Sequence, residues 1–197
     1  MNYLAHAYLS FMHEEVLVGN MISDFVKGKK KFDYPVNIQK GITLHRAIDT
    51  FTDAHEATKE AKAFFKPAVG AYSGAFVDVV YDHFLAINTE TWQEISLKDF
   101  AQAVYQLLEK HYQLLPGKFQ LMFPYMKTYD WLYNYQFNTG IERSFEGVAR
   151  RAVYLNNVAG AFESFEKNYD QLKPIADSFI IDVKKFAADH FNQHIKA

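Results

Sequence analysis

The sequence of 197 residues contains no cysteine. Without thiols the chain can form no disulfide framework, no thiolate zinc site and no cysteine nucleophile. The chain also lacks an excess of charge of either sign, because 21 basic and 23 acidic side chains leave a net charge of −2. That balance gives no overall electrostatic case for a nucleic-acid partner.

Long apolar runs are missing as well. None reaches the length that spans a membrane, and residues 1–15 lack the basic region and cleavage motif of a signal peptide. We therefore expect a cytoplasmic protein with no membrane partner. The sequence holds no dinucleotide-binding glycine motif, no P-loop, no nucleophile elbow and no His-Glu-x-x-His zinc motif.

Hydrophobic side chains, by contrast, make up 49% of the residues, and aromatic side chains make up 17%. At this length they support one domain with a large core. Period-3.6 patterning runs through most of the chain, alternating strand patterns are scarce, and no repeat or Pro/Gly-rich linker interrupts it. We expect an all-α fold, a single-domain multi-helix bundle that spans residues 1–197.

Caps, glycines and prolines predict where these helices begin and end. Gly28 should end the second helix, and the lysine-rich segment after it should be a loop. Pro67 should end the fourth helix, Pro124 should kink or split an aromatic-rich segment, and Pro174 should lie between the last two helices or in the first turn of the last. The expected helices cover residues 2–11, 14–27, 35–53, 56–66, 71–87, 96–115, 118–138 and 139–154, followed by two more.

Histidines and aspartates recur on segments that otherwise look buried. In the 35–53 helix, His45 and Asp49 continue the face that begins with Ile38 and Ile42, at spacings of three and four residues. Both side chains should therefore point toward the interior or toward a cleft in it. A histidine and an aspartate four residues apart can chelate one metal ion or form a hydrogen-bonded pair.

The 71–87 helix carries a second pair at this spacing, Asp78 and Asp82. Two like charges so placed repel, and in apolar surroundings both stay ionised only beside a cation. Because the helix contains no lysine or arginine, that cation must be a metal ion or an arginine from another helix. The alternatives are a helix cap or simple exposure. His83 faces about 100° away from Asp82, either as a further ligand or as a core histidine.

Two other segments add one candidate each. His6 lies on the apolar first helix, and Asp24 follows Asn20 by one helical turn. Gly19 stands inside the second helix, where glycine costs about 1 kcal/mol relative to alanine and usually permits close approach of another helix or a ligand. A lone buried histidine is more often a core residue than a ligand, so the set carries more weight than any member. Oxygen and imidazole donors together suit Mn²⁺, Mg²⁺ or Fe²⁺ better than a structural zinc ion.

Four segments, in order, carry a specific family resemblance: MNYLAHAYLS, GNMISDFVKG, GITLHRAIDTFTDAH and VDVVYDHFLA. Over roughly residues 1–87 they resemble the acyl carrier protein phosphodiesterase family, and the likeness continues more weakly through FNTGIERSFEGVARRA at 137–152. The resemblance implies an all-helical, HD-phosphohydrolase-like fold and a Mn²⁺-dependent phosphodiesterase. It also implies the substrate, holo acyl carrier protein, from whose serine the enzyme removes the 4′-phosphopantetheine group.

The resemblance extends to residues inside the matching segments. It implies metal ligands among His6, His45, Asp49, Asp78 and Asp82, and catalytic roles for Asp24, His83 and Arg46. Candidate phosphate ligands, because their cationic groups suit phosphate oxygens, are Arg46, Arg150, Arg151 and Lys27. A basic segment consists of Lys27, Lys29, Lys30 and Lys31. We expect an acidic protein partner to bind there. No histidine is followed directly by aspartate, so the literal HD doublet of the wider superfamily is absent.

Three hypotheses follow. The leading one is a metal-dependent phosphodiesterase acting on holo acyl carrier protein, with Mn²⁺ as the expected ion and Mg²⁺ or Fe²⁺ as alternatives. The second keeps the site and changes the substrate to a nucleotide or another small phosphodiester. The third is a non-catalytic helical protein that binds carrier protein and purifies without a metal.

Overall fold

The computed structural model describes residues 1–152 and 159–195. The prediction of an all-α fold is confirmed for these residues, which form eleven α-helices and no strand. The helices are α1 (Tyr3–Tyr8), α2 (Glu14–Ile22), α3 (Val36–Ala54), α4 (Glu56–Val69), α5 (Ser73–Ala86), α6 (Leu97–Lys110), α7 (Gly117–Thr128), α8 (Trp131–Asn134), α9 (Asn138–Arg151), α10 (Ala159–Lys167) and α11 (Tyr169–His194). Of the helices described, none combines the length and apolar character that crossing a bilayer requires. The HD-phosphohydrolase likeness stays a prediction.

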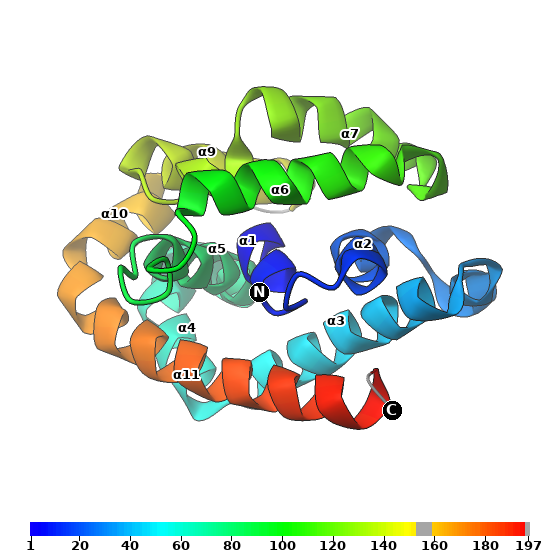
Figure 1. Cartoon of the computed structure of the whole chain (residues 1–197). Coiled ribbons are helices and arrows are strands. Elements are labelled where there is room, and N and C mark those ends of the chain that lie inside the picture. The colour runs from blue at the N-terminus through cyan, green and yellow to red at the C-terminus, as the bar shows by residue number, and fades with distance from the viewer. Residues whose placement is uncertain (153–158, 196–197) are drawn as a thin grey trace.

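Helix α1 occupies the middle of the molecule. Figure 1 shows α1 and α2 with α6 and α7 on one side and α3 and α11 on the other. Helix α1 packs against α2 and α5, and α2 packs against α3. A helix of six residues is too short to be stable alone, so its neighbours must hold it in place. Its buried residues run from Leu4 to Ala7 and include His6.

Helices α2 and α3 touch backbone to backbone. A Cβ atom on Gly19 would lie 2.1 Å from the carbonyl oxygen of Ile38, and one on Gly41 would lie 2.2 Å from that of Val16. No side chain tolerates such contacts, so glycine at both positions lets the helices meet. The predicted role of Gly19 in a close helix approach is confirmed, and this contact brings Asn20 of α2 against α3.

The prolines did not end helices where the sequence predicted. Helix α4 runs through Pro67 to Val69, because the ring and the carbonyl of Ala63 that it frees both lie on the exposed side. Helix α7 contains Pro124, so this proline does not split the segment, and the break comes at Asp130, whose φ of 44° is left-handed. Pro174 lies in the second turn of α11 rather than before it or in its first turn.

Other boundaries differ as well. Helix α2 ends at Ile22 rather than at Gly28, and α6 ends at Lys110 rather than near Leu115. The first helix ends at Tyr8 because Phe11 and Met12 take positive φ values of 50° and 54°. The segment Gly28–Asp33, predicted as a loop, forms 3₁₀ turns, and further 3₁₀ turns lie at Ser23–Phe25, Gly70–Tyr72 and Tyr112–Leu114. The predicted helix end near residue 154 lies outside the described residues.

Candidate metal centre

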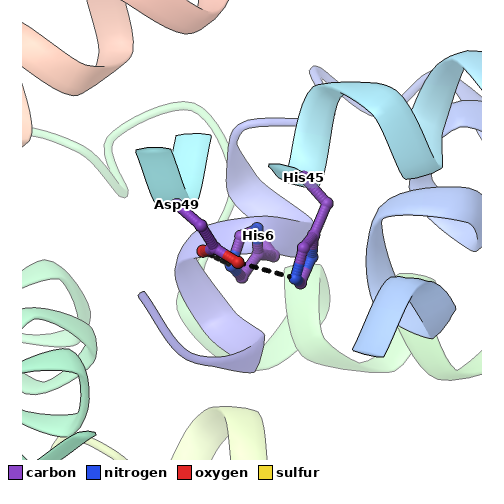
Figure 2. A group of neighbouring side chains, drawn as sticks. All are labelled: His6, His45 and Asp49. Atoms are coloured by element: carbon purple, nitrogen blue, oxygen red, sulfur yellow. Dashed lines mark ion pairs between the residues drawn. The ribbon is translucent and has the colours of Figure 1, made fainter. Parts of the chain in front are cut away.

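Three side chains converge between α1 and α3. His6 comes from α1, and His45 and Asp49 come from α3 (Figure 2). One potential ligand atom from each lies within 4.8 Å of the others. In the part of the chain that is described, this is the one group of three or more such side chains that meets this distance.

The geometry of the cluster is compact. The imidazole rings of His6 and His45 stack with their centroids 3.8 Å apart. The Nε2 atom of His6 lies 3.2 Å from Asp49 Oδ1, and the Nε2 atom of His45 lies 3.1 Å from Asp49 Oδ2. Both Nε2 atoms therefore face the same carboxylate, the arrangement expected of three ligands around one ion.

Helix α3 presents His45 and Asp49 through its periodicity. Ile38 and Ile42, on the same face, are fully buried, and His45 is only 5% exposed. The prediction that this face points inward is therefore confirmed. Asp49 lies one turn further on and is half-buried, so the cluster has one side within reach of solvent.

Asn20 fixes the other side of both rings. Its side-chain oxygen accepts a hydrogen bond from His6 Nδ1 at 2.8 Å, and its backbone carbonyl accepts one from His45 Nδ1 at 2.7 Å. The sequence pattern alone predicts no separate role for Asn20. The available signal was an asparagine on the apolar helix that carries Gly19, where a buried amide needs partners.

The donor set fits a divalent cation. His6 Nε2 is buried and makes no hydrogen bond of acceptable geometry among the described residues, although it faces the Asp49 carboxylate. A nitrogen lone pair aimed at a carboxylate is unfavourable unless a proton or a metal ion lies between them. Two imidazole nitrogens and one carboxylate form a common set of ligands for a catalytic transition-metal ion.

The pKa shifts of the three clustered side chains agree with a site that binds positive charge. Burial opposes charge on His45, but hydrogen bonds to Asp24 and Asp49 outweigh it and raise the pKa of His45 to about 9. Burial and the charge of His45 lower the pKa of His6 to about 4. Burial opposes ionisation of Asp49, but the two histidines that face its carboxylate hold its pKa well below the usual range. Strong perturbations of this kind are typical of functional sites.

A cavity of about 280 Å³ adjoins the cluster, and the charged residues of its wall are Asp24, Asp78, Arg151 and the amino-terminal Met1. Asp24 lies 3.2 Å from His45 Nε2, and this hydrogen bond lowers the pKa of Asp24. Asp78 accepts a hydrogen bond from the Met1 amino group at 2.9 Å. Segments far apart in the sequence thus form one polar cavity beside the three clustered side chains.

Asp82 lies apart from the three clustered side chains. It is fully buried, and its oxygens accept backbone N–H groups of Asn2, Leu4 and Ala5 at 3.2, 2.7 and 3.3 Å. Burial raises the pKa of Asp82 to about 7, against the opposing effect of the Met1 amino group and these N–H groups. Asp82 therefore caps the start of α1 from α5, one of the alternatives that the sequence left open.

His83 also lies apart from the cluster. Its Nδ1 donates to the carbonyl oxygen of Tyr135 at 2.8 Å, and its Nε2 lies 2.9 Å from the hydroxyl of Tyr169. Burial lowers the pKa of His83. Both nitrogens thus have partners that tie α5 to the end of α8 and to α11.

The predicted phosphate ligands are spread over the surface. Arg46 is exposed and donates to the carbonyl oxygen of Val26 at 2.8 Å, and Arg150 is exposed and pairs with Glu146 at 3.8 Å. Lys27 is exposed just before the Gly28–Asp33 turns. Of this set, Arg151 lines the cavity beside the cluster.

The chain is similar in sequence to proteins of one family. It matches the family model described as acyl carrier protein phosphodiesterase over residues 1–183. The acyl carrier protein phosphodiesterase of Serratia proteamaculans (strain 568) is 34% identical over 177 residues, which cover 88% of this chain and 90% of the relative. The one from Yersinia pestis is 33% identical over 184 residues, which cover 91% and 92%. No solved structure matches. Since the family model spans nearly the whole chain, candidate metal centre included, the chain belongs to the acyl carrier protein phosphodiesterase family.

Proposed function

We propose that this protein hydrolyses the phosphodiester that joins 4′-phosphopantetheine to the serine of holo acyl carrier protein. The family assignment supports the reaction class and the substrate. The observation that carries the proposal within the molecule is the convergence of His6, His45 and Asp49 beside a cavity with an arginine in its wall.

A divalent cation would be held by His6, His45 and Asp49, and we propose Mn²⁺, with Mg²⁺ or Fe²⁺ as alternatives. Three protein ligands leave coordination positions open, as catalytic metal sites require. When bound, the ion supplies Lewis acidity toward a phosphoryl oxygen and toward water.

Asp24 would transfer the proton, and Arg151 would neutralise charge on the phosphoryl group. Asp24 is ionised, is 70% exposed and lies beside His45, so it can accept a proton from the attacking water. Attack on phosphorus forms the new P–O bond and breaks the bond to the serine oxygen, which takes the proton back from Asp24. The Arg151 guanidinium would neutralise the phosphoryl oxygens as charge develops.

The basic segment would receive the carrier protein. Lys27, Lys29 and Lys30 are exposed, and Phe32 beside them is 64% exposed. Lys27 follows Asp24 by three residues, so their Cα atoms are at most about 11 Å apart. An acidic partner bound there would keep its prosthetic group near the cavity.

Mass spectrometry of holo acyl carrier protein tests this proposal. After incubation with the protein and Mn²⁺, the carrier protein should lose the mass of 4′-phosphopantetheine. An unchanged mass together with hydrolysis of a nucleotide or another small phosphodiester would point to the second hypothesis. Binding of the carrier protein with no hydrolysis of any phosphodiester would point to the third.

A further inference from the structure

Asn20 is a fully buried polar side chain at the crossing of α2 with α1 and α3. Its amide nitrogen donates to the carbonyl oxygen of His6 at 2.9 Å and to Ser10 Oγ at 3.0 Å. Its side-chain oxygen faces His6 Nδ1, and its backbone carbonyl faces His45 Nδ1. Every polar group of the side chain, and its main-chain oxygen, is thus directed at a helix of the candidate metal centre.

The orientation of the amide follows from the chemistry of its partners. The carbonyl oxygen of His6 can only accept a hydrogen bond, so the amide group facing it must be the NH₂. Ser10 Oγ donates its own hydrogen to the same carbonyl at 2.8 Å, so toward Asn20 it acts as an acceptor. The oxygen of the amide therefore faces His6.

The tautomers of both histidines follow in turn. An amide oxygen and a main-chain carbonyl oxygen accept but cannot donate, so Nδ1 of His6 and Nδ1 of His45 must each carry a hydrogen. Metal binding requires the neutral imidazole, and a neutral ring with its hydrogen on Nδ1 has its lone pair on Nε2. Those are the two atoms that face Asp49.

We propose that Asn20 is the positioning residue of the metal centre, setting the metal-binding tautomer of His6 through its side chain and that of His45 through its main chain. The inference deepens the proposed function and rests on its metal site. Partners that orient a ligating imidazole typically change metal affinity by about 10–100-fold when they are removed. A side-chain substitution affects the His6 partner alone, because the main-chain carbonyl that faces His45 is present with any residue.

Asn20→Leu tests the proposal, since leucine is close in size and offers no hydrogen bond. Titration of the purified chain with Mn²⁺ should show affinity about 10–100-fold below that of the unsubstituted protein. Imidazole ¹⁵N spectra of the metal-free variant should show that Nδ1 of His6 no longer carries a hydrogen, whereas Nδ1 of His45 still does. The matched control is Asn37→Leu, because that asparagine lies on α3 and pairs with Glu15.

Asn20→Asp separates positioning from folding. An aspartate keeps the oxygen that faces His6, although its second oxygen replaces the NH₂ group beside the His6 carbonyl and lowers stability. The Nδ1 hydrogen and much of the Mn²⁺ affinity should still return relative to Asn20→Leu. If Asn20→Leu does not fold, two other variants test the inference through the ¹⁵N signal of the His6 Nδ1 hydrogen. We expect Asn20→Asp to retain this hydrogen and Asn20→Ser, whose shorter side chain cannot reach His6, to lose it.

An unchanged His6 tautomer and unchanged Mn²⁺ affinity in a folded Asn20→Leu, or loss of the Nδ1 hydrogen in Asn20→Asp, would overturn the inference. Failure of the proposed function looks different. In that case the unsubstituted protein leaves holo acyl carrier protein intact or does not bind Mn²⁺, whichever tautomer His6 has.

Discussion

His6 and His83 are equally buried, at 3% and 2% exposure, yet their surroundings differ in kind. Both nitrogens of His83 have neutral partners, Tyr135 and Tyr169, which a core histidine needs. His6 has one such partner, and its other nitrogen faces a carboxylate. The same residue type therefore supports packing in one place and, in our proposal, binds a metal ion in the other.

The role of His83 in packing has a pH signature. Burial lowers its pKa in the folded state, so as pH falls below about 6.5 the unfolded chain takes up a proton that the folded chain does not. The stability that His83 contributes is present above about pH 6.5 and is lost as pH falls. Urea unfolding of metal-free protein should show the stability advantage over His83→Gln shrinking from pH 7.5 to pH 5.5. A gap that stays constant with pH would contradict this account.

Asp49 should be the residue on which metal binding depends most, because it carries the one carboxylate of the three clustered side chains. Asp49→Asn keeps the size of the side chain and removes its charge. We expect Mn²⁺ binding to be lost and turnover of holo acyl carrier protein to fall by about 10²–10³-fold. The matched control is Asp53→Asn, one turn further on α3, where the carboxylate pairs with Lys62 at 2.9 Å. Equal effects of the two substitutions would contradict the assignment.

At the scale of helices, the close contact of α2 with α3 is what brings the Asn20 carbonyl to His45. A methyl group on Gly19 would meet the Ile38 carbonyl, a backbone atom that cannot rotate away. Gly19→Ala should therefore destabilise the fold by about 1–3 kcal/mol, as overpacking does. It should also weaken Mn²⁺ binding, because separating the helices moves Asn20 away from His45.

Gly147→Ala is the control for that prediction. Gly147 lies inside α9 with nothing near the position of its missing Cβ atom. Alanine there should leave stability unchanged or raise it by about 0.5–1 kcal/mol. Unfolding free energies of both variants by chemical denaturation would make the comparison, and Gly19→Ala as stable as Gly147→Ala would contradict the role given to the contact.

Sequence periodicity predicted the helices and the inward face of α3, because Ile38 and Ile42 mark one side of an amphipathic helix. Periodicity could not predict that Asp82 caps α1. Residues 76–86 of α5 are buried almost all round, so their pattern singles out no face, and only tertiary packing decides that Asp82 meets the start of α1. The helix ends predicted from the prolines were wrong for a related reason. Where a helix turn is exposed, water can satisfy the backbone carbonyl whose hydrogen bond the proline removes, so the helix continues.

At the scale of the whole molecule, the basic segment begins directly after Val26, and Asp24 in the cavity wall lies two residues before it. Arg46 donates to the carbonyl oxygen of Val26 between them. This continuity is why we expect charge on the basic segment to affect capture of the carrier protein and not the chemical step. Electrostatic complementarity acts chiefly on association and on specificity.

Lys29→Glu combined with Lys30→Glu should raise KM for holo acyl carrier protein by about 10-fold and leave kcat near its original value. The effect should shrink as salt is added, because exposed charges are screened. Steady-state kinetics at two ionic strengths measures both. The control pair, Lys98→Glu with Lys118→Glu, reverses two exposed lysines at the starts of α6 and α7. A fall in kcat, or an equal rise in KM for the control pair, would contradict the docking role.

The measurement that most directly tests the account is anomalous X-ray diffraction from crystals of the protein soaked in Mn²⁺. Our account predicts one strong anomalous peak at bonding distance from Nε2 of His6, Nε2 of His45 and the carboxylate of Asp49. A peak held instead by Asp78 or Asp82, or no peak beside α3 in crystals whose protein still removes phosphopantetheine in solution, would contradict it.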